Sequence, residues 1–321
     1  MFDNLDWEKR EKTDVSVVII ARNCEDYLLK SLPIIPNQKT SFSCEIIGIC
    51  TKSQDRTLEV FNRYCTKTIE ISSKEFHHAK TRNLGVRTSK GEFIVFLTGD
   101  AIPANEHWLQ NLVAPLIKDE EIAAAYSKQI PYPDTPPWEK RDILGGVNAG
   151  LSYKKRKVDF SNLEQVKDYK NNIGRYIMFS NVSAVYRGAL IRKHPFNESI
   201  PAVEDQEWCK RIIELGYATL FVPNSVVIHS HNHSLNQVYF CHYRYGKAFA
   251  KFLNCSTMLD SQNIWKIFKM WTYEITEDLR FVWGGNTSCI KKIFWAFASP
   301  FYRIVKILAY REGLTEYREN K

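Results

Sequence analysis

Short runs of consecutive apolar residues alternate with amphipathic segments along the first 230 or so residues of the chain. A strand covered by helices on both faces is apolar at successive positions, so such runs predict buried strands. The expected strands are 15–21, 45–50, 68–71, 93–97, 122–130, 178–187, 218–222 and 226–229. The expected helices are 25–32, 57–64, 106–116 and 206–215, with another that begins near His77. This order of elements predicts an α/β fold around a mostly parallel sheet.

The chain from Ser234 onward has a different pattern, with aromatic and aliphatic residues at helical spacing and lysines at the edges. Residues 236–321 hold 13 Lys and Arg against 7 Asp and Glu, and four of the eight tryptophans. The longest charge-free runs, 281–290 and 293–302, are only half of the roughly 20 residues that span a bilayer. The pattern favours helices lying in a membrane interface. Packing of the same faces on the rest of the chain, or on a second copy in a homo-oligomer, stays open.

The other 235 residues are enough for one large α/β domain. The N-terminus is polar, which predicts no secretory signal, and the eight cysteines include no C-x-x-C pair. Reduced thiols and a cytoplasmic location are therefore expected. No motif for nucleic-acid binding is present. Four prolines in 131–137 are expected to mark the crossing between two halves of the domain, and 138–170 is expected to be irregular, with a basic run at 154–157.

One candidate site follows the predicted strand 93–97, which runs directly into Thr98-Gly99-Asp100. An acid at the carboxyl end of such a strand lies where open α/β sheets bind ligands. Upstream, a helix begins with cationic and hydrogen-bonding residues: His77, His78, Lys80, Arg82 and Asn83. Cationic groups beside a carboxylate suit a metal-bound diphosphate. For Asp100 alone, an acid that caps a helix on a surface turn is the better explanation.

A second candidate site lies between Ala202 and His233. Glu204 and Asp205 begin a predicted helix, whose buried side Trp208 helps to form. The nearby histidines at 229, 231 and 233 alternate, which would place them on one face of a strand as in a three-histidine zinc site.

In their order along the chain, these motifs resemble those of family-2 glycosyltransferases, within them the rhamnosyltransferase-like branch. The first motif is matched by Phe76, His78, Arg82, Asn83, Phe96, Leu97, Thr98, Asp100, Ala101 and Pro103. Further matches are Ser53, Asp55, Thr57, Ser180, Asn181, Ser183 and Ala184. The last motif is matched by Glu204, Asp205, Arg211, Gly216, Tyr217, Pro223, Val227 and His229. Cys50 and Thr98 stand where the family usually has acids.

The resemblance covers about residues 15–250 and implies the GT-A fold of nucleotide-diphospho-sugar transferases, with C-terminal amphipathic helices appended. Residues 1–235 would form the catalytic domain, with a donor half at about 1–130 and an acceptor half at about 131–235, and 236–321 a helical region. It implies that Asp205 is the catalytic base, and that Asp100 and His229 hold a divalent metal, Mg²⁺ or Mn²⁺. It also implies that the strand ends near His229 and that the segment then turns away, which disfavours the three-histidine site. Implied donor contacts are Ala21, Arg22, Asn23, Thr51, Asp55, His78, Lys80, Arg82, Asn83, Thr98, Gly99 and Asp100. Implied acceptor contacts are Asn181, Glu204 and Trp208.

The same resemblance implies inverting transfer of a sugar from a nucleotide donor, with dTDP-rhamnose as the first candidate. The acceptor would be a surface glycan on a lipid carrier, reached at the inner face of the plasma membrane. Two alternatives remain open: transfer from a UDP-hexose or UDP-N-acetylhexosamine, and an inactive glycan-binding partner that has lost the acids at 50 and 98. A nucleotidyltransferase is disfavoured, because residues 15–25 hold no glycine-rich phosphate loop.

Overall fold

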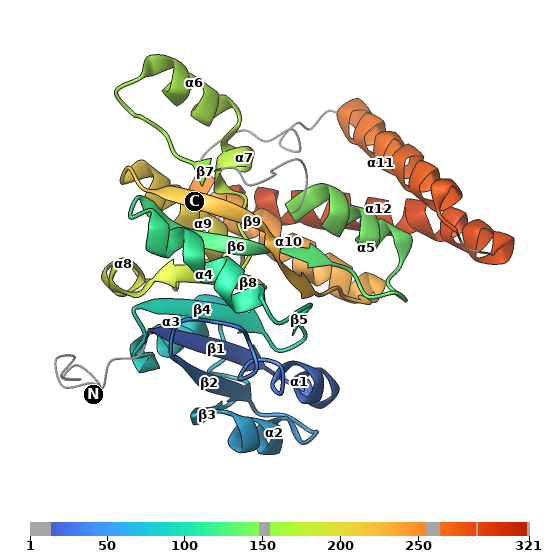
Figure 1. The fold of residues 1–321 in the computed structure, drawn as a ribbon. Coiled ribbons are helices and arrows are strands. Elements are labelled where there is room, and N and C mark those ends of the chain that lie inside the picture. The colour runs from blue at the N-terminus through green and yellow to red at the C-terminus, as the bar shows by residue number, and fades with distance from the viewer. Residues whose placement is uncertain (1–13, 148–154, 254–263, 287, 320–321) are drawn as a thin grey trace.

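The computed structural model describes residues 14–147, 155–253, 264–286 and 288–319. In these residues one nine-stranded sheet forms the centre of the molecule, in the order β3-β2-β1-β4-β8-β6-β9-β5, with β7 also paired to β9 (Figure 1). The strands are β1 Val15–Ala21, β2 Cys44–Thr51, β3 Lys67–Ile71, β4 Phe93–Thr98, β5 Ile102–Pro103, β6 Ile122–Ile130, β7 Lys155–Arg156, β8 Ser183–Arg187 and β9 Ala218–Ile228.

Strand directions confirm the predicted mixed but mostly parallel sheet. β1 pairs in parallel with β2 and β4, β2 with β3, and β6 with β9. β8 lies antiparallel between β4 and β6, and the short strands β5 and β7 pair antiparallel with β9. Six strands therefore run in one direction, so their carboxyl ends meet at one edge of the sheet.

Helices cover both faces of this sheet, as the apolar strand sequences require. The helices are α1 Glu25–Ser31, α2 Thr57–Tyr64, α3 His78–Thr88, α4 Trp108–Lys118, α5 Pro137–Asp142, α6 Leu163–Asn171, α7 Ile173–Ile177, α8 Gly188–Lys193, α9 Glu204–Glu214, α10 Leu235–Leu253, α11 Ile264–Gly284 and α12 Cys289–Glu319. Leu28, Phe61 and Leu112 bring α1, α2 and α4 into the core on one face. Val86, Ile191 and Ile212 bring α3, α8 and α9 into the core on the other.

Three predicted elements differ from the structure. Residues 218–229, predicted as two strands around Pro223, form the single strand β9, whose register against β6 shifts at Ser127/Lys128 instead of breaking. The predicted strand 178–187 begins only at Ser183. Segment 138–170 is not irregular: it contains α5, a short π-helix Ile143–Val147 and most of α6, because Pro137 and Asn162 supply helix starts.

The basic run at 154–157 is folded into the structure where it is described. Arg156 is buried and lies over the ring of Tyr126, and its neighbour Lys155 forms ion pairs with Asp119 and Glu121. Lys154 lies outside the described residues. The run is therefore neither a simple solvated face nor a loop over a site, because its central arginine packs on β6.

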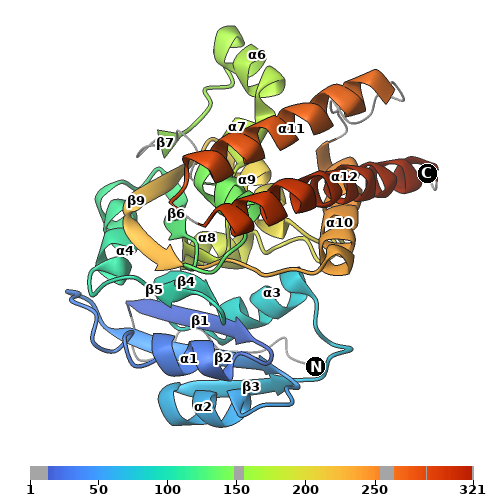
Figure 2. The same cartoon turned by 90° about the vertical axis from the view of Figure 1, so that its right-hand side faces the viewer.

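The helices α10, α11 and α12 lie beside the part of the sheet that β6, β8 and β9 form, away from β2 and β3 (Figures 1 and 2). α10 and α12 pack backbone to backbone: a Cβ at Gly246 would overlap the carbonyl oxygen of Tyr310, and one at Gly313 that of Tyr243. A buried cluster of charges then ties α11 and α12 to α5, with Arg303 bound to Asp278 and Asp142. Among the described helices, none has the length and apolar character needed to span a membrane.

Candidate active site

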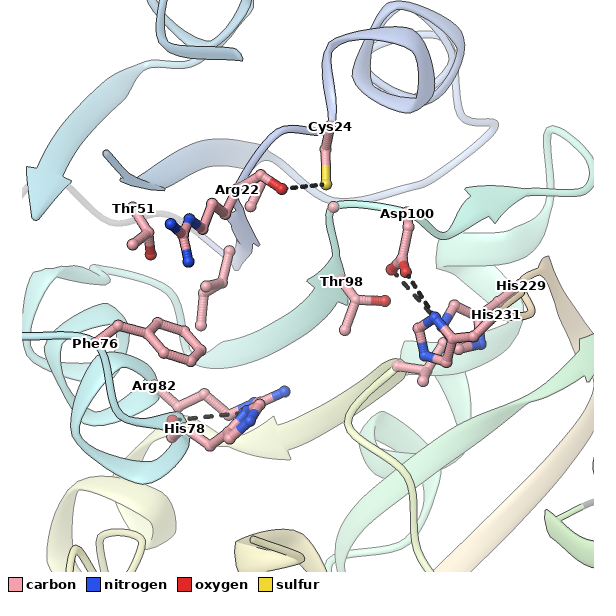
Figure 3. Close-up of a pocket in the computed structure, with 14 residues that line it drawn as sticks. Arg22, Cys24, Thr51, Phe76, His78, Arg82, Thr98, Asp100, His229 and His231 are labelled. Atoms are coloured by element: carbon pink, nitrogen blue, oxygen red, sulfur yellow. Dashed lines mark hydrogen bonds and ion pairs between the residues drawn. The ribbon is translucent and has the colours of Figure 1, made fainter. Parts of the chain in front are cut away.

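A cavity of about 310 Å³ lies where the carboxyl ends of β1, β2 and β4 meet the beginning of α3 (Figure 3). The strands end at its rim, and α3 contributes side chains from the opposite side. Eight of the twelve residues predicted to contact a donor line it: Ala21, Arg22, Thr51, His78, Arg82, Thr98, Gly99 and Asp100. The parallel arrangement of the strands thus collects residues that are up to 80 positions apart in the sequence.

Gly99 allows the turn that carries Asp100 to lie directly on β1. Its amide donates a 3.0 Å hydrogen bond to the carbonyl of Ile20. A Cβ at position 99 would come within 2.5 Å of the Cβ of Ala21. A larger residue would therefore push the turn away from β1 and move the Asp100 carboxylate.

Asp100, His229 and His231 form a cluster at one end of the cavity, where Figure 3 shows both imidazoles turned toward the carboxylate. The His229 Nε2 lies 3.6 Å from Asp100 Oδ1, and the His231 Nδ1 lies 3.4 Å from Asp100 Oδ2. Burial lowers the pKa of both histidines, so each presents a neutral nitrogen lone pair. One carboxylate and two imidazoles within 4.8 Å of one another are a donor set that fits a divalent transition metal.

A second layer of hydrogen bonds sets the orientation of His229. Its Nδ1 lies 3.0 Å from the Oε1 of Gln129, and the amide nitrogen of Gln129 donates to Ser180. Because Oε1 can only accept, Nδ1 carries the proton and Nε2 is left free to face Asp100. This arrangement is typical of histidines that bind metals.

His231 is a member of the cluster that the sequence prediction left out. The alternation of histidines at 229, 231 and 233 was the available signal, but we expected the segment to turn away after His229. β9 does end at Ile228, yet the chain continues extended far enough for His231 to share the side of His229. His233 instead stacks on the ring of His231, 4.5 Å away, and is not part of the cluster.

Asp205 lies at the beginning of α9, where it is partly exposed. Its Oδ2 accepts a hydrogen bond from the amide of Asn181 and its Oδ1 one from the amide of Gln206, both at 2.9 Å. Burial and the neighbouring Glu204 carboxylate raise the pKa of Asp205 to about 7. A carboxylate that titrates near neutrality can accept a proton more effectively than an ordinary aspartate.

Glu204 connects this acid to the cavity. Its Oε1 lies 2.8 Å from the Nη1 of Arg82, which lines the cavity, and accepts a 3.1 Å hydrogen bond from the Nδ2 of Asn181. Burial opposes the ionisation of Glu204, but the charge of Arg82 and the hydrogen bonds to the carboxylate, one of them from Asn181, together outweigh burial and lower the pKa of Glu204. Glu204 therefore stays charged and holds Asn181 and Arg82 in fixed positions between the cavity and Asp205.

Three polar atoms in the cavity lining are buried without a hydrogen-bond partner among the described residues. They are the Oγ1 atoms of Thr51 and Thr98 and the Nε of Arg82. Buried polar groups in proteins are nearly always satisfied, so each such atom calls for an explanation. A polar ligand in the cavity would supply the missing partners.

The remaining four predicted donor residues do not line the cavity. Asn23 and Asp55 join the loops after β1 and β2, since Asn23 accepts from the amide of Gln54 and Asp55 from that of Glu25. Lys80 is exposed on α3, outside the cavity lining.

Two further predicted site residues, Asn83 and Trp208, are buried in the core and do not line the cavity. Asn83 bonds through its side chain to the backbone N–H and C=O of Phe196. Trp208 is 0% exposed, packs edge-on against Tyr186, and donates its indole N–H to the carbonyl of His194. In this structure each of them fixes the segments behind the site.

Four other lining residues were not predicted as site residues: Ile20, Cys24, Phe76 and Val182. The ring of Phe76 meets the ring of His78 edge-on, 5.1 Å away, and forms an apolar wall of the cavity. Cys24 faces the cavity with its thiol bonded to the Arg22 carbonyl, and burial raises its pKa to about 11, so it stays protonated. Phe76 could have been found, because it belongs to the same motif as His78.

Comparisons with known proteins agree with this geometry. The family model described as glycosyl transferase family 2 matches residues 16–197. The O-antigen chain rhamnosyltransferase WbaN of Salmonella anatum is 29% identical over 204 residues, 62% of this chain and 61% of that protein. The O-antigen chain rhamnosyltransferase RfbN of Salmonella typhimurium is 30% identical over 203 residues, 61% of this chain and 60% of that protein. The chain thus aligns with about three fifths of the length of these relatives.

Two solved structures share the fold at low sequence identity. The mannosyltransferase PcManGT from Pyrobaculum calidifontis, in complex with GDP-Man and Mn²⁺, superposes with a TM-score of 0.57 at 15% identity, covering 98% of this chain and 92% of that one. TarS of S. aureus (residues 1–349), in complex with UDP-GlcNAc, gives a TM-score of 0.53 at 14% identity, covering 96% and 92%.

Proposed function

Because the chain belongs to glycosyl transferase family 2, we propose that it moves a sugar from a nucleotide-diphosphate donor to a hydroxyl group of a glycan, with inversion of the anomeric carbon. The observation that carries this proposal is the Asp205 carboxylate, whose pKa is raised to about 7, linked through Glu204 to an arginine of the cavity. A general base next to a polar cavity is what a direct displacement at a sugar carbon requires.

In the proposed reaction, Asp205 takes the proton of the acceptor hydroxyl while that oxygen forms a bond to the anomeric carbon of the donor. The bond from this carbon to the diphosphate oxygen breaks, and the nucleotide diphosphate leaves with the electron pair. The amides of Asn181 and Gln206 hold the carboxylate in one orientation. Arg82 and Thr98, with their unpartnered polar atoms, are the proposed contacts of the diphosphate.

Asp100, His229 and His231 are the residues that would hold a divalent metal. The metal, when bound, would supply Lewis-acid stabilisation of the leaving diphosphate. Mg²⁺ prefers oxygen ligands, whereas two imidazoles and one carboxylate favour a softer ion. We therefore expect Mn²⁺ to be the better of the two ions here, which is also the ion bound in the Pyrobaculum calidifontis structure.

The proposed donor is dTDP-rhamnose. The support is the similarity to two rhamnosyltransferases at about 30% identity. A UDP-sugar is the second candidate, because the fold neighbour TarS was solved with UDP-GlcNAc. Cys50, buried next to Thr51 in the cavity lining, stands where the family usually has an acid, so base recognition would depend on Thr51 and backbone groups.

The proposed acceptor is a glycan on a lipid carrier, with the enzyme attached peripherally to the cytoplasmic face of the membrane. The support is a row of exposed aromatic residues on α12, where Phe294, Phe297 and Phe301 are 64%, 71% and 65% exposed. Lys291 and Lys292 precede this row, and residues 289–311 hold no Asp or Glu, so the beginning of α12 suits an anionic lipid surface. Arg303 and Lys306 do not contribute, because both are bound to Asp142.

Vesicles test the membrane part of the proposal. Phe294→Asp/Phe297→Asp should abolish co-sedimentation with vesicles of 30% phosphatidylglycerol in phosphatidylcholine, which the wild type should show. Leu163→Asp is the matched control, since this residue is exposed on α6, far from α12 in Figure 1. A wild type that stays in the supernatant, or that forms a dimer through this row in light scattering, would contradict a membrane role.

A donor screen tests the transferase itself. Purified protein with Mn²⁺ or Mg²⁺ is offered dTDP-rhamnose, UDP-hexoses, UDP-N-acetylhexosamines and GDP-sugars, and melting temperature and nucleotide release are measured. One donor should stabilise the protein in a metal-dependent way, and Asp100→Ala should remove the effect. If no donor stabilises it with either metal, the chain is better explained as a glycan-binding partner without activity.

A further inference from the structure

A second cavity, of about 330 Å³, lies between α5, α10, α11 and α12, and the proposed mechanism makes no use of it. Four charged residues from α5, α11 and α12 line it, namely Asp142, Glu274, Arg303 and Lys306. On α10, His242 and Tyr245 line it as well. We refer to it as the C-terminal cavity.

The charged lining is rigid and electrically balanced. Arg303 binds both oxygens of Asp142 at 2.9 Å, and Lys306 binds the same carboxylate at 2.6 Å. Two cations face two acids across the cavity, so the lining attracts neither a phosphate nor a metal ion. A neutral ligand with many hydroxyl groups fits it better, because it can donate to the acids and accept from the Lys306 ammonium, whereas every nitrogen of Arg303 is already bonded.

His242 and Tyr245 give the cavity two aromatic faces that are open to a ligand. Their rings meet edge-on, 5.3 Å apart, and neither side chain has a hydrogen-bond partner among the described residues. Burial and the charge of Lys306 lower the pKa of His242 to about 3, so its neutral ring can both donate and accept. Flat apolar faces beside hydrogen-bonding groups are suited to a sugar ring, which has apolar C–H faces and a polar rim.

The C-terminal cavity is close to the proposed base. α10, which carries His242 and Tyr245, packs through Ala248 on Ile200 and Ala202, in the segment that leads into Asp205. Ala248 lies about one turn of α10 beyond Tyr245, so this contact places the cavity lining near the beginning of α9. Figure 2 shows α10 between α3 and α12, and the glycine contact with α12 fixes its position.

We propose that the C-terminal cavity is an acceptor subsite, which binds a neutral sugar unit next to the one that carries the attacking hydroxyl. The inference rests on the proposed function, because only a glycan acceptor has such a second unit. In this arrangement one sugar lies at Asp205 and the adjoining one at His242 and Tyr245, which line the cavity from α10. The subsite would select acceptors longer than one sugar.

Saturation-transfer NMR on the full chain can test this subsite. The probes are methyl glycosides of galactose, glucose, mannose and rhamnose, together with neutral disaccharides of the same sugars. At least one disaccharide should bind the wild type more tightly than its component glycosides. His242→Ala/Tyr245→Ala should weaken that disaccharide by tenfold or more, and Tyr245→Phe, which removes only the hydroxyl, should weaken it less. Tyr273→Ala, on an exposed part of α11, is the matched control and should bind as the wild type does.

Melting temperature and affinity for the nucleotide diphosphate show whether each variant is folded. The inference is overturned if the variants bind the disaccharides as well as the wild type does, or if none of these glycans binds the wild type. Failure of the proposed function is a different result: no nucleotide sugar would then bind or turn over, whatever the glycans do.

Discussion

Two arginines are buried against carboxylates in this molecule, and they differ in how completely they are paired. Arg303, 1% exposed, uses all of its nitrogens: Nε and Nη2 bind Asp278, and Nη1 binds Asp142. Arg82, 8% exposed, forms an ion pair with Glu204, but its Nε is left without a partner among the described residues. Both arginines lie at the edge of a cavity, but only Arg82 has a donor left for a ligand, whereas Arg303 joins helices.

The difference indicates which buried charge is structural and which awaits a ligand. A buried ion pair with every donor satisfied holds elements together, and removing one partner typically costs about 3–5 kcal/mol. A buried cation with an unsatisfied donor has lost a hydrogen bond to water without replacing it, which costs free energy until a bound ligand supplies the partner. Two acids differ in the same way. Asp278 forms ion pairs with Arg141 and Arg303. The carboxylate of Asp205, among the described residues, accepts hydrogen bonds only from backbone amides.

The largest effect is expected for Asp205→Asn. Transfer should fall about 10²–10⁴-fold, the usual range for loss of a general base. The variant should fold as stably as the wild type. The pKa of Asp205 is about 7 in the folded protein and near 4 in the unfolded chain, so ionisation of this acid destabilises the wild type as the pH rises from 4 to 7. At pH 8 the variant should melt at or above the wild-type temperature, measured by calorimetry. A loss of activity that comes with a large drop in melting temperature would instead make Asp205 structural.

Arg303→Lys should come second, with a loss of about 2–3 kcal/mol in the free energy of unfolding. Lysine keeps the charge but cannot form the forked bonds to Asp278 and Asp142 at once. Chemical denaturation measures the loss. Affinity for the nucleotide should stay the same. If it falls as well, Arg303 also supports nucleotide binding, and its role is not purely structural.

Arg82→Lys is the matched change at the other arginine, and its effect should be the reverse. The lysine still pairs with Glu204, so the free energy of unfolding should change by less than about 1 kcal/mol. Affinity for the nucleotide diphosphate should drop roughly tenfold, because the fork that meets a phosphate is lost. Isothermal titration calorimetry with the nucleotide diphosphate measures this affinity. An unchanged affinity would show that Arg82 does not contact the donor.

Glu204→Gln should have the mildest effect, a change in pH dependence. The wild-type rate should rise with pH to a midpoint near 7, where Asp205 loses its proton. Without the Glu204 charge, Asp205 ionises more easily, so the midpoint should move down by about one pH unit. Rates at saturating donor from pH 5 to 9 measure this. A midpoint that stays near 7 would show that burial alone raises the pKa of Asp205.

The strands and the donor cavity could be predicted because their signals are local. Apolar runs such as 15–21 and 93–97 mark buried strands, and the parallel order brings their carboxyl ends together. The histidine at 229 and the acid at 100 could be placed by their motifs. The orientation of His231 could not, since it depends on a few backbone angles after β9 ends.

The C-terminal region could be predicted only as amphipathic helices. Its charged cluster pairs Arg303 with Asp142, 161 positions away, and such a pairing leaves no trace in a single sequence. Likewise, Trp208 lies on the helix that Asp205 begins, and the sequence placed it both on the buried side of that helix and at the acceptor; its side chain is in the core. Neighbours in a motif can face opposite sides of a helix, so a motif alone does not separate a contact from its support.

Val203, immediately before the Glu204–Asp205 pair, has the left-handed backbone angles φ 51° and ψ 36°. A β-branched residue in this region typically costs about 1–3 kcal/mol, which glycine would avoid. A mutant library selected only for heat resistance is therefore expected to accumulate Val203→Gly. The same glycine would loosen the backbone that aims Asp205, so a lineage selected for turnover should keep the valine. At position 203, selection for thermal stability and selection for catalysis would therefore favour different residues.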